Sequence, residues 1–508
     1  MPSRIIRTLK AFSLLALTLA VAGCIGTGGI LPHTAPVPAN QLATDAAIQD
    51  AARDAHWPVS QWWRAYGDAQ LDQWVDLSVQ GSPSIAMATA RVRQAKAMAG
   101  VVESAESVHL NADAALKRHK WQNDDFYGPG VLNSATTWDN EAGLGLSYSL
   151  DLWGRDSNNS ERALDMAHMT AAQARQAQIE LENNVVHVYI QFSLHYAQRD
   201  IVQATLEQQQ QILDLAQKRL DGGIGTHFEV SQAQTPLPET RRQLDALDEE
   251  IALTRNQLSA LAGKGPGEGA RLQRPTLSLA AEVELPSALP AELLGQRPDV
   301  VASRWSVAAQ ARGIDVAHAG FYPNVDLTAS LSFLGTEGTM LSFLNAQKLG
   351  YNVGPAISLP IFDGGRLRGE LGEASAGYDV AVAQYNQTLV GALKSISDQL
   401  IRRKSMAKQA DFAAESVASA RKTYDIAKVA YQRGLTDYLN VLNAQTLLFH
   451  EQQVQQQVQA ERLGAHAELV TALGGGVQAG NDVPAAGREQ APKTPAGLAL
   501  VDRLKNGQ

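Results

Sequence analysis

A long segment of the chain that follows Gly154 carries apolar residues at helical spacing. Within two runs the steps are three, four or seven residues: Leu181, Val185, Val188, Phe192 and His195, then Leu206, Leu213 and Leu220. A narrow apolar stripe of this kind is typical of coiled-coil helices. The pattern predicts one helix from Gly154 to Leu220, which at ~1.5 Å per residue measures about 100 Å.

The residues after this segment predict a helical hairpin. Asp221-Gly222-Gly223 ends the first helix, and a returning helix is expected from about Thr226 to Leu261. Pro236 and Pro238 are expected to disturb the returning helix locally, because proline lacks the amide hydrogen that a helix needs.

Four shorter stretches have the character of strands: 106–118, 141–152, 322–334 and 349–361. The second contains GLGLSYSLDLW, in which small or apolar residues alternate with others. A period of two is typical of a strand with two different faces. The strands form two pairs, and each pair is joined by a loop.

Residues 57–79 are rich in tryptophan. We interpret these side chains as the core of a small helical subdomain rather than as a ligand-binding surface: Trp57, Trp62, Trp63 and Trp74. A further helix, Ser84 to about Ser104, follows Gly81-Ser82-Pro83 and leads into the first strand.

The second half of the chain repeats the first. Residues 214–235 and 425–446 share Asp, Ala, Gly and a closing Ala-Gln-Thr at an offset of 211 positions. LDLWGR and LPIFDGGR keep the same offset at Gly154 and Gly365. A repeat this long is not a solenoid, so we infer two structurally equivalent halves.

The duplication fixes the expected order of the second half. A helix is expected from Arg297-Pro298-Asp299 to about Ala319, a long helix from Gly365 to Gln432, a turn at Gly434 and a returning helix over 436–473. The expected organisation is a first repeat at 57–263, a linker at 264–290, a second repeat at 291–476 and a disordered tail at 477–508.

The N-terminus is typical of an exported lipoprotein. Basic residues precede a short apolar stretch, Ala11–Ala22, which has too few residues to span a membrane. The sequence VAGC resembles a bacterial lipobox, which implies removal of a signal peptide, 1–23, and a covalent lipid on Cys24. The alternative is an ordinary signal with an incidental cysteine. Residues 24–56, rich in Pro, Ala and Thr, predict an extended tether.

Composition and charge argue against several functions. The net charge of −9 gives no support to a nucleic-acid partner, and the single cysteine rules out an intramolecular disulfide or a CxxC metal site. His187 and His195 are interpreted as residues of the apolar seam, that is, the stripe described above, or of the surface, rather than as metal ligands. Asp151 and Asp363, at strand–helix junctions, are interpreted as turn or cap residues rather than general acids or bases. We therefore expect no enzyme, no metal and no cofactor beyond the lipid on Cys24.

The strands decide the expected environment of the mature chain. Their length suits an outer membrane crossed at a tilt, whereas no mature segment is apolar enough for a spanning helix. Four strands cannot close a barrel, and open edges in lipid leave backbone groups unpaired. Three chains supply twelve strands that enclose an aqueous lumen. The expected fold is a mixed α/β, mostly helical membrane protein: a trimeric 12-stranded β-barrel continuous with a long periplasmic α-helical coiled-coil barrel.

Several motifs, in their order along 57–476, resemble the TolC/OprM outer membrane factors in their lipoprotein (NodT-type) branch: LDLWGR, RPDV, GFYPNVDL, LPIFDGGR, YQRGLTDYLNVLNAQT and ALGGG. The resemblance implies a trimeric exit duct in the outer membrane that exports drugs or other toxic small molecules. The chain departs from the family pattern at His109, which stands where the family has a proline; the equivalent proline of the second half, Pro323, is present. Arg304 replaces the glutamate that usually follows RPDV.

The resemblance also implies where the duct closes. In the family, residues at the start of the returning helices narrow the periplasmic tips like an iris. Carried over by position, they are Leu439, Asn440 and Asn443, with Phe228, Glu229 and Gln232 in the first half. Relatives often carry aspartate at the 440 or 443 position. Asparagine at both predicts a neutral ring, to which Glu229 adds one charge per chain. The alternative role is packing against neighbouring helices.

The two hairpin turns are the predicted docking surface for a periplasmic adaptor. They comprise Gly223, Ile224, Gly225, Thr226, Gly434, Leu435 and Thr436. Glycine ends a helix and exposes backbone, which also suits a simple helix-ending turn. The pump behind the adaptor is of the RND, major-facilitator or ABC type. The alternatives are a type I protein-secretion channel and, in a different class, a periplasmic coiled-coil scaffold lipoprotein.

Overall fold

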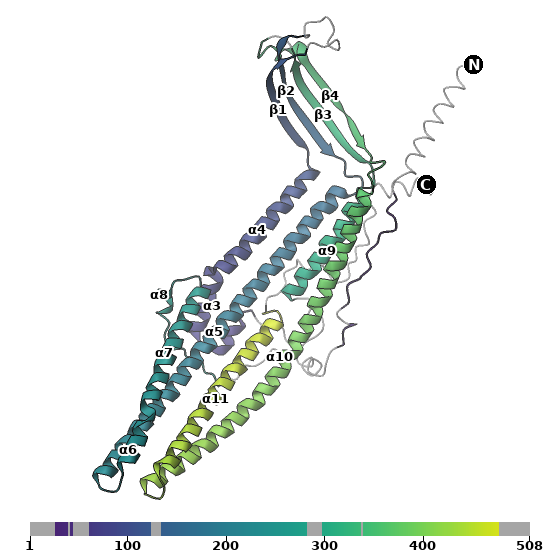
Figure 1. The fold of residues 1–508 in the computed structure, drawn as a ribbon. Helices are drawn as coiled ribbons and strands as arrows, with labels where there is room; N and C mark the ends of the chain where they lie inside the picture. The colour runs from purple at the N-terminus through teal and green to yellow at the C-terminus, as the bar shows by residue number, and fades with distance from the viewer. Residues whose placement is uncertain are drawn as a thin grey trace, which may run out of the picture.

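The computed structural model describes residues 26–38, 41–43, 60–122, 134–281, 297–336 and 339–476. Within them the molecule is elongated, with a sheet at one end and the tips of two helical hairpins at the other (Figure 1). The expected signal peptide, Cys24, Trp57 and the C-terminal tail lie outside the described residues.

Each strand is continuous with one helix. The bounds in the first half are α4 (Pro83–Glu103), β1 (His109–Lys120), β2 (Thr136–Ser149), α5 (Arg155–Asp221), α6 (His227–Gln234) and α7 (Pro236–Leu261). Those in the second half are α9 (Pro298–Ala319), β3 (Asn324–Gly335), β4 (Leu349–Ser358), α10 (Arg366–Gln432) and α11 (Tyr438–Ala472). The expected order of helices and strands is therefore present twice. The expected disturbance at Pro236 is confirmed, because α6 ends before it and α7 begins with it.

The four strands form one antiparallel sheet of order β1-β2-β3-β4. Residues directly opposite each other in neighbouring strands share a face, and the face alternates along each strand. One face is apolar: Leu110, Leu116, Leu144, Leu146, Leu327, Leu331, Phe333, Leu349, Tyr351, Val353 and Ile357. The other is mostly polar or glycine: Asn111, Asp113, Glu141, Gly143, Gly145, Ser147, Thr328, Ser330, Ser332, Asn352 and Gly354.

The apolar face is largely uncovered by the described part of the chain. Tyr351 is 83% exposed and Val353 is 73% exposed. An apolar outer face and a polar inner face are the pattern of a strand between lipid and an aqueous lumen. Within the described ranges, no helix combines the length and apolarity of a membrane span.

The apolar seam of α5 was predicted correctly in its middle and wrongly near its end. Leu181, Val185 and Phe192 are buried as expected, whereas Val188 and His195 of the same predicted run are half-buried. In the last third the expected leucines, Leu206, Leu213 and Leu220, are only half-buried. The buried positions are instead Val202, Thr205, Gln209, Ile212 and Ala216, in steps of three and four.

The displaced seam contains polar groups that have partners. The Thr240 hydroxyl of α7 donates to Oε1 of Gln209 at 2.8 Å, so this pair is satisfied inside the helix interface. A hydrophobicity pattern does not reveal such a seam, because two of its five positions are polar. The half-buried leucines lie beside it and are accessible to neighbouring chains.

The tryptophan-rich segment forms a compact core against the middle of α5. Trp62 and Trp63, in a short 3-10 helix, and Trp74 of α3 (Ala69–Gly81) are buried in one cluster with Val185 and Phe192. This confirms the expected packing role for three of the four tryptophans.

The expected linker, 264–290, packs more closely than its composition suggests. It contains a short helix, α8 (Pro266–Gly269), and buried Leu272, Leu277 and Leu279. The backbone N–H groups of Thr276 and Leu277 donate to Asp68 at 2.7 and 2.8 Å. These contacts fix the first part of the linker on the core, whereas 282–296 lie outside the described residues.

The described part of the expected tether follows α10. The N–H groups of His33 and Thr34 donate to Oδ1 of Asp379 at 3.0 and 2.9 Å. The N–H of Val37 donates to the Asn386 side chain at 2.9 Å. The segment is extended, as expected, and it is bonded to the helix.

Candidate functional site

The first hairpin ends in a turn that requires glycine. Gly223 has φ of 74°, and its N–H donates to the Leu220 carbonyl at 3.0 Å. The N–H groups of Ile224 and Gly225 donate to the Arg219 carbonyl at 3.0 and 2.9 Å. These hydrogen bonds satisfy the last carbonyl groups of α5. A residue with a side chain at position 223 would be strained by the left-handed backbone conformation.

The second hairpin ends in a turn of the same type. Gly434 also has φ of 74°, and its N–H donates to the Tyr431 carbonyl at 3.0 Å. The N–H of Leu435 donates to the Ala430 carbonyl at 2.9 Å. The glycine repeated in the sequence therefore marks a repeated backbone conformation at both tips.

The returning helices begin with side-chain caps that use two of the predicted aperture residues. The N–H of Glu229 donates to the Thr226 hydroxyl at 3.2 Å, and the N–H of Thr226 donates to the Glu229 carboxylate at 3.3 Å. In the second half, the Asn440 amide donates to Thr436 at 2.7 Å and to Asp437 at 2.9 Å. Glu229 and Asn440 occupy equivalent positions, and both are tied to the cap of their own helix.

Four apolar residues at the tips are exposed. Ile224 and Leu435, in the turns, are 71% and 75% exposed. Phe228 and Leu439, one turn further on, are 69% and 48% exposed. These four side chains pack little against their own chain. Any packing role they have is therefore with other chains of the trimer or with a partner protein.

The remaining aperture candidates are polar. Asn443 is exposed on α11, whereas Gln232 is half-buried on α6. Together with Asn440 they carry no charge, so the carboxylate of Glu229 is the one acidic group among the six predicted positions.

A tyrosine cluster below the tips was missed by the sequence reasoning. Tyr424, Tyr431 and Tyr438 are buried between the two hairpins, and the rings of Tyr431 and Tyr438 lie 6.0 Å apart. The Arg219 guanidinium of α5 lies 5.1 Å from the centroid of the Tyr431 ring. Burial raises the pKa of Tyr438 to about 12, so it stays neutral. The signal was present, because the three tyrosines recur every seven residues.

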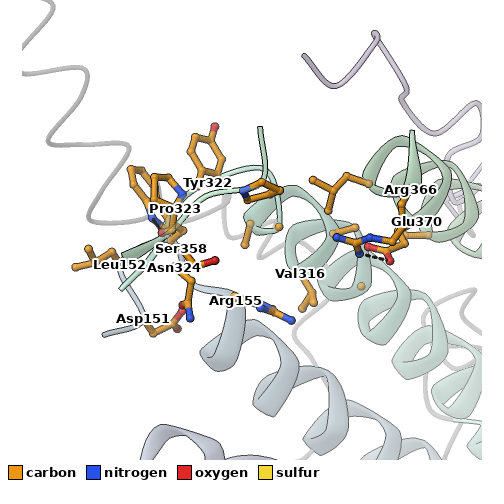
Figure 2. Close-up of a pocket in the computed structure, with 18 of the residues that line it drawn as sticks. Asp151, Leu152, Arg155, Val316, Tyr322, Pro323, Asn324, Ser358, Arg366 and Glu370 are labelled. Carbon is orange, nitrogen blue, oxygen red and sulfur yellow. Dashed lines mark hydrogen bonds and ion pairs between the residues drawn. The ribbon is translucent and has the colours of Figure 1, made fainter. Parts of the chain in front are cut away.

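A hollow of about 820 Å³ lies at the other end of the helices, where the strands begin (Figure 2). Trp153 stacks on Tyr322 with ring centroids 4.5 Å apart, and its indole N–H donates to the Pro323 carbonyl at 2.8 Å. Arg366 and Glu370 form an ion pair at 2.6 Å on its far side. The contacts of Trp153 connect the residues just before α5 to those just before β3, whereas the Arg366–Glu370 pair lies within α10.

The carboxylates at these junctions cap helices, as predicted. Asp151 accepts from the N–H groups of Asp156 and Ser157 at 3.1 and 2.9 Å. Asp363 accepts from the N–H groups of Gly365 and Leu367 at 3.0 and 2.9 Å. Burial by itself raises the pKa of Asp151, but the hydrogen bonds lower it overall.

His187 and His195 of α5 have ordinary polar neighbours. Nε2 of His187 lies 3.8 Å from the Glu468 carboxylate, and Nδ1 of His195 lies 3.2 Å from the Thr254 hydroxyl. Burial lowers the pKa of both, which keeps them neutral at pH 7. In the described ranges, no group of three metal-ligating side chains is assembled.

Sequence comparison separates the two halves in the same way as the structure. The profile of the outer membrane efflux protein family matches residues 74–264 and 289–475. The chain belongs to this family. The two matched segments each hold one pair of strands and one hairpin, and the family's function is efflux across the outer membrane.

Known relatives cover nearly the whole chain. It is 46% identical over 484 residues to the fusaric acid resistance protein FusA of Burkholderia cepacia, with 93% of this chain and 89% of FusA covered. It is 29% identical to the multidrug resistance outer membrane protein MdtP of Escherichia coli K12, with 94% and 99% covered.

Solved channels of the family share the fold. VceC of Vibrio cholerae has a TM-score of 0.76 at 31% identity, covering 82% of this chain and 99% of VceC. CusC has a TM-score of 0.74 at 27% identity, with 85% and 98% covered. The channels are trimers with a helical barrel and a four-stranded sheet in each chain, which confirms the expected fold class.

Proposed function

We propose that a trimer of this chain is the exit duct of a tripartite system, which receives small toxic molecules from a periplasmic adaptor and an inner-membrane pump. The proposal depends mainly on one observation: two equivalent hairpin tips lie at the end of the molecule opposite to the sheet (Figure 1). Both present exposed apolar side chains on a turn closed by left-handed glycine. An apolar surface of this kind at the end of a duct suits a protein partner.

The adaptor is proposed to dock on the turns, Gly223 to Thr226 and Gly434 to Thr436. Ile224 and Leu435 supply the apolar contacts, since they lie in the two turns and are the most exposed large apolar residues at the tips. The pump is of the RND, major-facilitator or ABC type. A type I secretion system shares the same architecture and remains the alternative partner.

The cargo is proposed to be small and organic. FusA is named for resistance to fusaric acid and MdtP for multidrug resistance. Fusaric acid is therefore the first compound to test. A panel of drugs of different charge then tests whether the aperture discriminates.

The aperture is proposed to be a weakly charged ring. Leu439, Asn440 and Asn443 of α11 and Phe228, Glu229 and Gln232 of α6 start the returning helices, as a closing ring requires. Since Glu229 is held in a capping box, its carboxylate has a fixed position. A ring with three acids per trimer attracts cations less than one built of several aspartates per chain.

Lipid attachment at Cys24 is proposed to anchor the N-terminus at the outer membrane. The tether starts at this residue, and its described part is bonded to α10 next to the sheet end. Incorporation of labelled palmitate in wild-type cells, and its loss in Cys24→Ala, is the expected result. Equal labelling of both proteins contradicts the anchor.

Capture of the partner tests the function directly. Leu435→Cys places a thiol on the exposed second turn, and a thiol-linked photo-crosslinker is loaded in living cells. We expect a periplasmic adaptor to be captured and identified by mass spectrometry. The matched control is Val108→Cys, which is 57% exposed but lies at the sheet end of the molecule.

The outcomes separate the hypotheses. Capture of an adaptor at Leu435→Cys and not at Val108→Cys, together with loss of fusaric acid resistance on deletion of the gene, supports the proposal. An adaptor of a protein-secretion system indicates the type I alternative. Capture of only peptidoglycan or other lipoproteins contradicts tip docking and favours the scaffold.

A further inference from the structure

The apolar face of β1 ends in two cations. Leu110 and Leu116 lie on this face, and the next residues on it are Arg118 and Lys120, at the end of the strand. Both basic side chains are exposed. Because side chains of a strand alternate, Lys117 and His119 point to the opposite, polar face.

An aromatic side chain accompanies these cations. Trp138 of β2 lies directly opposite Arg118, and the guanidinium lies 5.7 Å from the centroid of the indole ring. Tryptophan is enriched where a membrane surface meets water, with its ring among the headgroups. Arg118 and Trp138 therefore mark the edge of the apolar band.

A third cation lies over the same face. The ammonium of Lys348, which precedes β4, is 3.3 Å from the position that a Cβ on Gly335 would occupy. Gly335 is paired with Asn140, which is itself paired with Leu116, so this position belongs to the apolar face.

The acidic groups of the first two strands are kept away from these cations. Asp113, Asp139 and Glu141 alternate onto the polar face. Among the residues of the four strands, the apolar face carries no carboxylate. Among the strand residues, Arg118 and Lys120 thus have no carboxylate on their own face, and their exposed charges can bind an anionic ligand.

The position of these cations along the sheet determines which leaflet of the membrane they contact. β1 follows α4, so Lys120 lies at the end remote from the helices (Figure 1). This step rests on the proposed function, in which the helices lie in the periplasm. The cations then lie at the level of the headgroups of the outer leaflet.

We propose that Arg118, Lys120 and Lys348 bind the phosphate groups of a phosphorylated glycolipid of the lipid A type in the outer leaflet. Its acyl chains lie on the apolar face, along Leu116 and Phe333. Arginine binds phosphate through two N–H groups at once, and lysine adds a point charge. Trp138 packs beside Arg118 at the sugar level.

Binding of diphosphoryl lipid A to the purified full-length trimer tests this site. Native mass spectrometry in detergent measures the bound lipid for wild type, for Arg118→Gln/Lys120→Gln and for Lys117→Gln. We expect the double variant to bind about 10- to 30-fold more weakly, since each cation contributes about 1 kcal/mol at an anionic membrane surface. Lys117→Gln, on the same strand but the polar face, is expected to bind like wild type.

Further measurements test whether the site recognises the phosphate groups of lipid A. Dephosphorylated lipid A is expected to bind wild type as weakly as diphosphoryl lipid A binds the double variant. Equal loss in the Lys117→Gln control, no loss in the double variant, or equal competition by phosphatidylglycerol overturns the glycolipid site.

The result is independent of the efflux assays. Recovery of heat-sensitive trimers shows that a variant is folded, and Arg118→Lys, which keeps the charge, is expected to retain most of the binding. If lipid A binding follows the cations while no adaptor is captured, the proposed duct function fails and the lipid site stands. If efflux is normal and lipid A binding ignores the cations, the lipid site alone fails.

Discussion

At the scale of single residues, the two tips keep one backbone with different side chains. Glu229 and Asn440 are equivalent, and both bond to the cap of their helix. Gly225 and Thr436 are equivalent too. A Cβ on Gly225 would lie 2.7 Å from the backbone N of Leu220. The second turn accommodates Thr436 and, in the described structure, lacks the additional bond that the N–H of Gly225 makes to Arg219.

This difference predicts the effect of Gly225→Thr. The first turn should relax toward the geometry of the second and lose one hydrogen bond, which costs about 1 kcal/mol locally. Gly223→Ala should cost about 1–2 kcal/mol, because it forces a Cβ into a left-handed conformation. Amide hydrogen exchange at the tip measures both. A smaller loss of stability for Gly223→Ala than for Gly225→Thr contradicts the view that the left-handed conformation of Gly223 is the main requirement of the turn.

A buried carboxyl on α5 gives a pH prediction. Glu182 is 4% exposed, and burial raises its pKa to about 7. Its folded pKa lies above the unfolded value, so the folded state binds the extra proton. Stability therefore falls as pH rises from about 4.5 to 7, by up to about 3 kcal/mol.

Replacement by glutamine tests this dependence. Glu182→Gln should be more stable than wild type at pH 8 and similar at pH 4.5, as measured by guanidinium unfolding. The matched control is Glu180→Gln. Glu180 accepts from Gln176 at 2.9 Å just as Glu182 accepts from Gln178 at 2.8 Å, but it is exposed. A pH-independent gain, or the same gain in both variants, contradicts the prediction.

At the scale of elements, Asp68 joins three segments. Its carboxylate caps α3 through the N–H of Leu71, accepts from the Tyr189 hydroxyl of α5 at 3.0 Å and accepts from the linker at Thr276 and Leu277. Burial raises its pKa, but these hydrogen bonds outweigh burial and lower it overall. The first repeat and the linker are thus connected through a buried charge with many donors.

Removing this carboxylate should be costly. Asp68→Ala leaves buried donors from three elements without an acceptor, so we expect a loss of about 3–5 kcal/mol in the free energy of unfolding. Asp437→Ala, which removes an exposed cap of α11 alone, should cost about 1 kcal/mol. Guanidinium unfolding of both variants measures the difference. Comparable losses contradict the joining role of Asp68.

At the scale of the whole molecule, the sheet is incomplete. β1 and β4 are edges of the four-stranded sheet, and the apolar face is largely uncovered within the described chain. Three chains and the surrounding lipid complete both. The half-buried leucines on the flank of α5 and the exposed apolar residues at the tips are likewise accessible to other molecules.

Neighbouring positions in β4 should therefore respond in opposite ways to a charge. Val353→Lys places a cation on the lipid face and should cost about 2–4 kcal/mol, with fewer heat-sensitive trimers in the outer membrane. Asn352→Lys places it on the lumen face and should be tolerated. Equal assembly of the two variants contradicts the assignment of the faces.

Local sequence determined most of the elements of this fold. Left-handed glycine at the tips, caps at Asp151 and Asp363, and the break at Pro236 depend on backbone chemistry within a few residues. The offset of 211 positions predicted the equivalence of the two halves, because equivalent turns need equivalent residues. These interactions are short in range, so one sequence carries enough information to predict them.

The tertiary structure decided what the elements touch. It moved the seam of α5 onto Thr205 and Gln209, packed the linker through Asp68 and bonded the tether to Asp379. It also fixed the strand register, which places Trp138 opposite Arg118. A polar residue is buried or exposed according to its partner's position, and that position depends on residues far away in the chain.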